Sequence, residues 1–358
     1  MIPVLLLSMI PVSLALKYGF AAPPIWVFVS AILALAVLAE WVKRATEQLA
    51  ERAGPAIGGL VNVSFGSVAE LILALFVLAG GETAVVRAQI TGSIIGTSLL
   101  GLGLAILVGG AARERQTFGR ERAGLLSSLL ILSVIALLLP AVFDYLSREA
   151  GSARARAIDE EDLSLGVSAV LILIYAGNLV YTLITHRDVF ARGEEFSEEL
   201  GGKARWSLAR SLAVLVLGTV AIALEADLVS AALAATAERL QLSRLFLGVV
   251  VLALVGTSAD LFAAVAFARR DRMGLVFGIC LGSAIQMALL VAPLLVLLSW
   301  LIGHPMDLVF SNPLELFAIA GTAFTVNAIA ADGETTWFEG LLLLGVYILF
   351  GLAFFFAA

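Results

Sequence analysis

The chain has 358 residues, of which 61% are hydrophobic and 14% are charged, and its formal net charge is −6. This composition excludes a soluble globular protein, because apolar segments of about 20 residues recur to the end of the chain, as in polytopic helical membrane proteins. The single cysteine, Cys280, excludes a disulfide framework or a cysteine metal site. Nucleic-acid binding has no support, since no basic patch with interleaved aromatic residues is present. The expected surroundings are a lipid bilayer.

Hydropathy predicts eleven membrane spans, and the first is interpreted as a retained span rather than a cleaved signal. The predicted spans are 3–18, 24–42, 56–79, 89–110, 124–144, 164–185, 207–227, 245–268, 274–302, 310–331 and 337–357. Most of the 22 Lys and Arg residues fall in loops on the N-terminal side. This distribution predicts a cytoplasmic N-terminus and an outer C-terminus, in the cell (inner) membrane of a prokaryote.

Two six-residue segments share the pattern Gly, hydroxyl residue, any residue, Ala, carboxylate, Leu. They are Gly66-Ser67-Val68-Ala69-Glu70-Leu71 and Gly256-Thr257-Ser258-Ala259-Asp260-Leu261. The same spacing aligns Gly92-Ser93 with Gly282-Ser283, which indicates a duplication. The two motifs lie an odd number of spans apart, so the halves should be inverted repeats, as in many secondary transporters. The predicted organisation is an N-terminal helix (1–23), a first repeat (24–185), an acidic cytoplasmic linker (186–206) and a second repeat (207–358).

The motif carboxylates lie near the middle of predicted spans. A charge there costs about 2.5–3.5 kcal/mol or more, so it indicates a functional site. Glycine weakens a helix by about 1 kcal/mol relative to alanine, and a helix broken at Gly66 or Gly256 would expose backbone carbonyls beside the carboxylates. Carboxylate, carbonyl and hydroxyl oxygens are ligands for a hard cation. The candidate metal ligands and their close neighbours are Glu70, Asp260, Gly66, Ser67, Thr257, Ser258, Gln286, Ser93, Ser283 and Thr97.

Charge balance predicts the reaction. Two ionised carboxylates that face each other in a low dielectric repel, and either one divalent cation or two protons would neutralise them. Such a site should exchange the cation for protons, driven by the proton gradient and without a cofactor. No phosphate-binding loop of the G-x-x-x-x-G-K-[ST] type is present.

Other polar residues allow more than one interpretation. Glu225 and Asp227 either form an interfacial pair or belong to a proton or ion access path. Glu315, Asn327 and Glu339 are interpreted as packing or interface groups. The acidic linker carries Glu194, Glu195, Glu198 and Glu199, and is either a solvated segment or a cation-collecting element.

Several motifs together resemble the calcium/proton antiporters (CAX-type cation/proton exchangers) of the cation/calcium exchanger superfamily. They are Ala45-Thr46-Glu47-Gln48-Leu49-Ala50, Gly58-Gly59-Leu60-Val61-Asn62, Phe65-Gly66, Gly92-Ser93-Ile94-Ile95-Gly96, Thr185-His186-Arg187, Gly282-Ser283-Ala284-Ile285-Gln286, and Asp332-Gly333 with Trp337-Phe338-Glu339-Gly340. The resemblance covers nearly the whole chain. It implies ten core helices in two inverted halves plus a first helix.

The resemblance also implies functional roles. Glu70 and Asp260 would hold the cation and the protons, with Thr257 and Gln286 beside them. Spans two and seven would be the moving gates of an alternating-access cycle.

The motifs differ from the family pattern at five positions, one of which is Leu261, where the family often has His. Ser67, Thr257 and Thr97 stand where the family usually has Asn, and Asp260 stands where it usually has Glu. The sequence Gly256-Thr257-Ser258 is instead similar to the sodium/calcium exchanger branch.

The leading hypothesis is therefore a Ca²⁺/H⁺ antiporter, with Ca²⁺ and H⁺ as the transported ions. A sodium-coupled exchanger, or an exchanger of another cation, is the alternative. An intramembrane enzyme is not expected, because the chain has no H-E-x-x-H motif and neither histidine lies within a span. The sequence leaves the oligomeric state open.

Overall fold

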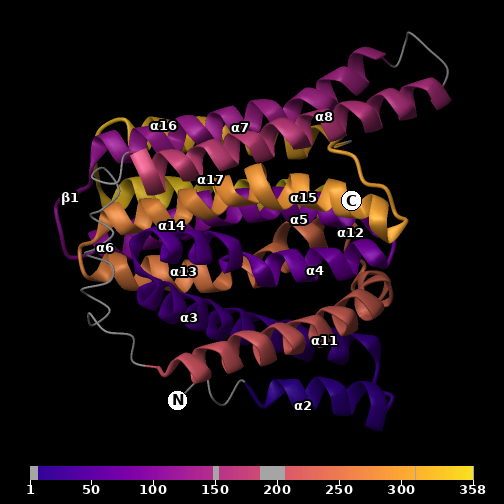
Figure 1. Ribbon diagram of the computed structural model, residues 1–358. Helices are drawn as coiled ribbons and strands as arrows, with labels where there is room; N and C mark the ends of the chain where they lie inside the picture. Colours follow the sequence, from indigo (N-terminus) through magenta and orange to yellow (C-terminus); the bar gives the residue numbers. More distant parts are fainter. Residues whose placement is uncertain (1–6, 148–152, 186–205, 311, 358) are drawn as a thin grey trace. The chain divides into compact units, whose positions relative to one another are not determined.

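The computed structural model describes residues 7–147, 153–185, 206–310 and 312–357, and these ranges are almost entirely helical (Figure 1). The α-helices are α2 Met9–Leu14, α3 Pro24–Phe65, α4 Val68–Ala79, α5 Thr83–Ile95, α6 Leu102–Gly110, α7 Arg120–Ser147, α8 Ala153–Val180, α11 Leu208–Leu240, α12 Arg244–Phe246, α13 Ala253–Arg269, α14 Met273–Gln286, α15 Ala292–Ile302, α16 Pro313–Ala330 and α17 Trp337–Phe356. The π-helical segments are η1 Ala15–Gly19, η2 Gly96–Gly101, η3 Tyr181–Thr185, η5 Leu247–Leu252 and η6 Met287–Val291. Helices suit these apolar runs, because in lipid each backbone polar group must be satisfied within the chain.

Nine helical segments within the described residues are long and apolar enough to cross a membrane. They are Pro24–Ala53, Thr83–Gly110, Arg120–Leu146, Glu161–Thr185, Leu208–Leu240, Arg244–Arg269, Met273–Ile302, Pro313–Ala330 and Trp337–Phe356. Each overlaps a predicted span, which confirms a polytopic helical membrane protein. Predicted span 56–79 contains α4, which has 12 residues, and predicted span 3–18 overlaps α2 and η1. The total of eleven spans remains a prediction.

Helix α3 bends sharply between Ala50 and Gly58. Eight residues of straight α-helix advance about 12 Å. The backbone of Gly58 nevertheless lies against the backbone of Ala50, so a Cβ atom at position 58 would collide with the Ala50 carbonyl group. One continuous helical element therefore contributes to two of the predicted spans.

The chain packs as two compact units, and each takes one segment from either side of the predicted linker. Of the described residues, unit 1 comprises 7–86, 178–185 and 206–259, whereas unit 2 comprises 87–147, 153–177, 260–310 and 312–357. Apart from Trp206, the predicted acidic linker lies outside the described residues. The predicted repeats, 24–185 and 207–358, are defined by a sequence duplication, whereas the two units are defined by contacts between residues. The boundaries of the repeats therefore remain a prediction.

In unit 1, α11 lies along α3 (Figure 1). The Trp206 ring stacks on the Trp41 ring at 5.8 Å between centroids, and the Trp206 backbone nitrogen donates to the Gln48 side chain. Twelve residues further along, Gly218 lies against Val42, where a Cβ atom would be 2.6 Å from Cγ2. The backbone of Trp206 contacts Gln48 and Arg52, whereas Gly218 contacts Val42, so the two helices run antiparallel.

In unit 2, α17 packs closely on α6 through glycines. A Cβ atom at Gly340 would lie 2.6 Å from the backbone nitrogen of Leu107 and 2.8 Å from the carbonyl oxygen of Gly103. Small residues allow this backbone approach, as they commonly do between membrane helices. Helices α14 and α16 pack on α7. Beside them, β1 (Gln116–Thr117) pairs antiparallel with β2 (Glu334–Thr335).

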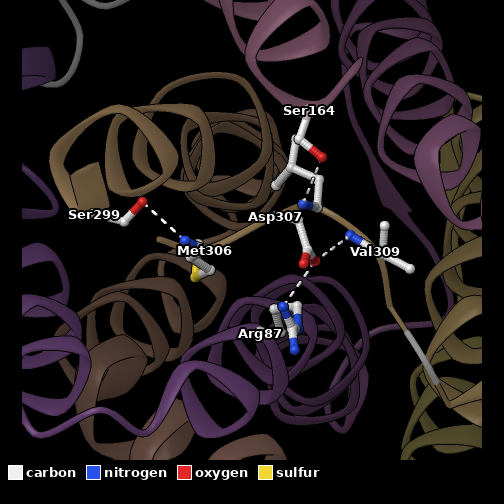
Figure 2. Close-up of polar contacts among 7 residues, drawn as sticks. Arg87, Ser164, Ser299, Met306, Asp307 and Val309 are labelled. Carbon is white, nitrogen blue, oxygen red and sulfur yellow. Dashed lines mark hydrogen bonds and ion pairs between the residues drawn. The ribbon is translucent and has the colours of Figure 1, made fainter. Parts of the chain in front are cut away.

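A non-helical strap, residues 303–310, leaves α15 and is held by polar contacts (Figure 2). The Asp307 carboxylate accepts from the guanidinium of Arg87 at 2.8 Å and from the backbone nitrogen of Val309 at 2.9 Å. Two serine hydroxyls accept from strap nitrogens: Ser299 from Met306 and Ser164 from Leu308. Helix α16 begins at Pro313, three residues after the predicted start of its span, and the Asn312 side chain caps it.

The two predicted repeats share a π-helical segment at matching positions. Segment η2 begins at Gly96, directly after α5, and η6 begins at Met287, directly after α14. Both follow the paired Gly-Ser dipeptides, which independently supports the duplication. Short π-helical segments are often found at functional sites, and these two directly follow segments that carry candidate ligands.

Candidate functional site

The first motif lies at a real break between helices. Helix α3 ends at Phe65, Gly66 and Ser67 form a turn, and α4 begins at Val68. Ser67 has φ −108° and ψ 21° and makes no side-chain cap, so its hydroxyl is not used to cap the new helix. The predicted break at Gly66 is therefore confirmed. It places Glu70 in the first turn of α4, near the positive end of the helix dipole.

Glu70 is buried, with 3% of its surface exposed, and it rests directly on the glycine of the second motif. A Cβ atom at Gly256 would lie 2.7 Å from Cγ of Glu70 and 3.3 Å from its Oε1. Both residues belong to unit 1. Position 256 therefore has to be glycine for the Glu70 carboxyl group to occupy this position.

The second motif differs from the prediction, because Gly256 lies inside the continuous helix α13. The irregularity comes earlier, in the π-helical segment η5, which ends at Leu252. The hydroxyl of Thr257 donates to the Ala253 carbonyl at 2.9 Å, and that of Ser258 donates to the Val255 carbonyl at 2.8 Å. Each hydroxyl keeps its oxygen lone pairs available for a further contact.

Asp260 follows Gly256 by one turn on the same helix and is partly buried. The next residue, Leu261, lies against Gly101 at the end of η2, where a Cβ atom would be 3.4 Å from Cδ1 of Leu261. This contact lies within unit 2. The π-helical segment of the first repeat thus supports the helix that carries the second carboxylate.

Helix α5 and the start of η2 form a buried polar face that includes the candidate ligands Ser93 and Thr97. Ser93 and Thr97 are 2% and 1% exposed, and the Thr97 hydroxyl donates to the Ser93 carbonyl at 2.8 Å. One turn earlier on the same face, Gln89 is equally buried. Gln89 was missed from the sequence, although its spacing of four from Ser93 could have identified it.

The corresponding helix α14 carries Ser283 and Gln286, which are partly buried. Gln286 is its last residue before η6. Of the candidate residues, Gly66, Ser67, Glu70, Thr257 and Ser258 fall in unit 1, and Ser93, Thr97, Asp260, Ser283 and Gln286 fall in unit 2.

Glu225 and Asp227 do not share one environment. Glu225 is wholly buried and its Oε1 accepts from the Ser13 hydroxyl at 2.7 Å, whereas Asp227 is exposed. The two side chains therefore do not act as one exposed pair, and the choice between an interfacial position and an access path for Glu225 stays a prediction.

The other polar residues have the packing roles predicted for them. Glu315 accepts from Thr91, Asn327 accepts from Ser127, and Glu339 completes a capping box with Thr336.

The fold and these residues define a polytopic helical membrane protein with duplicated carboxylate motifs. A model of the family described as sodium/calcium exchanger protein matches residues 23–184 and 210–356, and the chain belongs to this family. A Ca²⁺/H⁺ antiporter of Aphanothece halophytica is 39% identical over 98% of this chain and 95% of its own length. The Ca²⁺/H⁺ antiporter ChaA of Bacillus subtilis (strain 168) is 37% identical over 89% of this chain and 88% of its own.

Solved structures agree with this assignment. The structure of native YfkE has a TM-score of 0.83 and 32% identity, and the match covers 99% of each chain. A structure of the H⁺/Ca²⁺ exchanger CAX has a TM-score of 0.69 at 16% identity, covering 99% of this chain and 91% of its own, which supports the fold alone.

Proposed function

We propose that this protein is a secondary antiporter that exchanges Ca²⁺ for H⁺ across a membrane by alternating access. The observation that carries the proposal is the buried carboxyl group of Glu70 seated on Gly256 of the second motif. This contact supports one site built from both halves of a duplicated chain. The names of the relatives supply the ion pair, Ca²⁺ and H⁺.

Glu70 and Asp260 carry the charge in the proposed exchange. Ca²⁺ prefers six to eight oxygen ligands, and carboxylates, carbonyls and hydroxyls can supply them. When Ca²⁺ leaves, the two carboxylates would repel in the low-dielectric interior unless protons replace the cation. The empty doubly ionised state is therefore disfavoured, and release of Ca²⁺ is coupled to uptake of protons.

The neutral candidate ligands complete the coordination. The hydroxyls of Ser67, Thr257 and Ser258 and the side chains of Ser93, Thr97, Ser283 and Gln286 are the proposed neighbours of the ion, with backbone carbonyls exposed at the turn after Gly66. The family's usual amides are replaced by hydroxyls at three of these positions. Hydroxyl oxygens coordinate Ca²⁺ when the site stays rigid, and the burial of Thr257 and Thr97 supports such rigidity.

The proposed setting is the inner membrane of a prokaryote, with the N-terminus cytoplasmic and the C-terminus outside. Helices α3 and α11, which pack together within unit 1, are the proposed gates. The acidic linker 186–206 would then connect the two repeats on the cytoplasmic side. The family is one of transporters, so no catalytic residue or cofactor is proposed.

The test is ion flux in proteoliposomes that hold the purified protein and an imposed pH gradient. Uptake of radiolabelled Ca²⁺ should require the gradient, and replacing the pH gradient by a Na⁺ gradient should abolish it. Uptake driven only by Na⁺ would support the sodium-coupled alternative and overturn the proton coupling.

Glu70→Gln and Asp260→Asn should each remove Ca²⁺ flux while the protein stays folded, because each keeps the side-chain size and removes one charge. Glu238→Gln, at an exposed position near the end of α11, is the matched control. If both site variants transported Ca²⁺ at the wild-type rate, the carboxylate pair would not be the exchange site.

A further inference from the structure

A cavity of about 570 Å³ lies between α7 and α16, and none of its lining residues belongs to either carboxylate motif. It is lined by Arg120, Glu121, Gly124, Ser127, Ser128, Asn327, Ala330 and Ala331. All of these residues belong to unit 2. The volume falls within the range of about 300–1,000 Å³ that is usual for ligand pockets.

The lining offers one positive and one negative charge side by side. Arg120 and Glu121 are exposed, and within the part of the chain that the structure describes neither has an ion-pair partner. The stem of Arg120 is held by packing, because a Cβ atom at Gly333 would lie 3.1 Å from Cβ of Arg120. Gly333 has φ +74°, a conformation that glycine adopts readily, so the turn can pass directly beneath the arginine.

The cavity floor adds hydrogen-bonding groups. The buried hydroxyl of Ser127 donates to Oδ1 of Asn327 at 3.0 Å. Because Oδ1 is the acceptor in this bond, the amide nitrogen of Asn327 is the group that remains to donate. An anion in the cavity would therefore meet the guanidinium of Arg120 and the amide of Asn327.

The walls continue into surfaces suited to acyl chains. On α7, Ser128 is followed on the same face by Leu132, Ile135 and Leu139, which are 43%, 60% and 51% exposed. On α16, Phe324 is 76% exposed and lies one turn before the cavity residues. Both helices are membrane-span candidates. The span of α7 begins at the cavity, at Arg120, and the span of α16 ends there, at Ala330. The ends of such spans lie where lipid headgroups lie.

We propose that this cavity binds the headgroup of a membrane phospholipid that carries a primary amine, as in phosphatidylethanolamine. The phosphate lies against Arg120 and Asn327, and the ammonium group donates to Glu121. The acyl chains run along the exposed apolar faces of α7 and α16. The proposal does not depend on which ion the protein transports.

Native mass spectrometry of the purified protein tests the proposal through lipid binding alone. Wild type should bind phosphatidylethanolamine about fivefold better than phosphatidylcholine, because an exposed charged contact contributes about this much and the trimethylated amine cannot donate to Glu121. Glu121→Gln should lower phosphatidylethanolamine binding to the phosphatidylcholine level. Arg120→Gln should weaken both lipids, since both share the phosphate.

Gly124→Leu is a second variant that fills the cavity without changing charge. A Cβ atom at Gly124 meets nothing within 4 Å, and leucine is a better helix former than glycine, so the variant should fold. It should weaken both lipids, whereas Arg239→Gln, at an exposed site on α11, should weaken neither.

Equal lipid binding by wild type, Arg120→Gln and Gly124→Leu would overturn the proposal. So would retention of free phosphoethanolamine in place of the lipid, which would indicate a soluble ligand. If the protein instead formed an oligomer without bound lipid, and Gly124→Leu dissociated that oligomer, the cavity would be a contact surface for a second copy of the chain and the proposal would be overturned.

Discussion

The carboxyl group of Glu70 packs on Gly256, so that the acidic residue of one motif occupies the space left by the glycine of the other. A Cβ atom at position 256 would lie 2.7 Å from Cγ of Glu70, closer than any ordinary carbon–carbon contact. At position 256 the glycine of the motif therefore has a packing reason as well as a chemical one. The glycine makes room for the opposite repeat's carboxylate.

Gly256→Ala should reduce Ca²⁺ transport without preventing folding. The added methyl group has to displace the Glu70 side chain or shift α13, at a cost of about 1–3 kcal/mol. If that cost falls on the Ca²⁺-bound state, the affinity of the protein for Ca²⁺ falls about tenfold or more. Gradient-driven uptake of radiolabelled Ca²⁺ in proteoliposomes, measured over a range of Ca²⁺ concentrations, would show a raised half-saturation concentration.

Gly166→Ala on α8 is the matched control for this variant. A Cβ atom there meets nothing within 4 Å, so the same chemical change should leave transport unaltered. Wild-type transport by Gly256→Ala would mean that the position of Glu70 against α13 has no bearing on ion exchange.

The sequence predicts the break at Gly66 but not the continuous helix at Gly256. Both glycines follow apolar runs and precede a hydroxyl residue, so the local pattern is the same. In the second repeat the irregularity is the π-helical segment η5, which ends at Leu252. A π-helical turn accommodates one extra residue without a turn signal, so composition and spacing do not reveal it.

Contacts between residues that are far apart in the chain leave no signal in the local sequence. Ser13 and Glu225 are 212 positions apart, and nothing in either local sequence indicates the other. The sequence alone therefore left Glu225 as an interfacial or access-path residue. Apolar length, by contrast, predicted eleven spans, and nine of them overlap helical segments of the described residues that are long enough to cross a membrane, because the thickness of a bilayer sets the length of a span.

Ser13→Ala should destabilise unit 1. The hydroxyl donates to Oε1 of Glu225 at 2.7 Å, and both residues are wholly buried. Removing the donor leaves a buried carboxyl oxygen without this hydrogen bond, at a cost of about 1–3 kcal/mol. Helix α2, which supplies Ser13, carries no charged side chain.

Thermal unfolding in detergent measures the loss at Ser13. Glu225→Gln keeps an acceptor for Ser13 and should lose less stability than Ser13→Ala, since a neutral amide is easier to bury. A Tm of Ser13→Ala equal to that of wild type would show that the bond contributes nothing to stability.

Asp307→Ala should destabilise the strap more than Arg87→Ala does. Asp307 accepts from both Arg87 and the backbone nitrogen of Val309, so its loss removes two bonds, whereas loss of Arg87 removes one. Since 36% of the Asp307 side chain is exposed, solvent screens the ion pair, which should contribute about 1 kcal/mol or less. A double-mutant cycle with both alanine variants, followed by thermal unfolding, would isolate that coupling. A coupling near zero would assign the strap's stability to its backbone hydrogen bonds.

Gly340→Ala should destabilise unit 2 more than an alanine substitution at either of the other two glycines of α17, Gly345 and Gly351. The added Cβ atom would lie 2.6 Å from the Leu107 backbone nitrogen and 2.8 Å from the Gly103 carbonyl oxygen, and backbone atoms of a packed helix cannot move aside singly. Helices α17 and α6 have to separate, at a cost of about 1–3 kcal/mol or more. Gly345→Ala on the same helix is the control, because a Cβ atom there meets nothing within 4 Å. Thermal unfolding of both variants in the same detergent should show a lowered Tm for position 340 alone, and equal Tm values would contradict the close packing of α17 on α6.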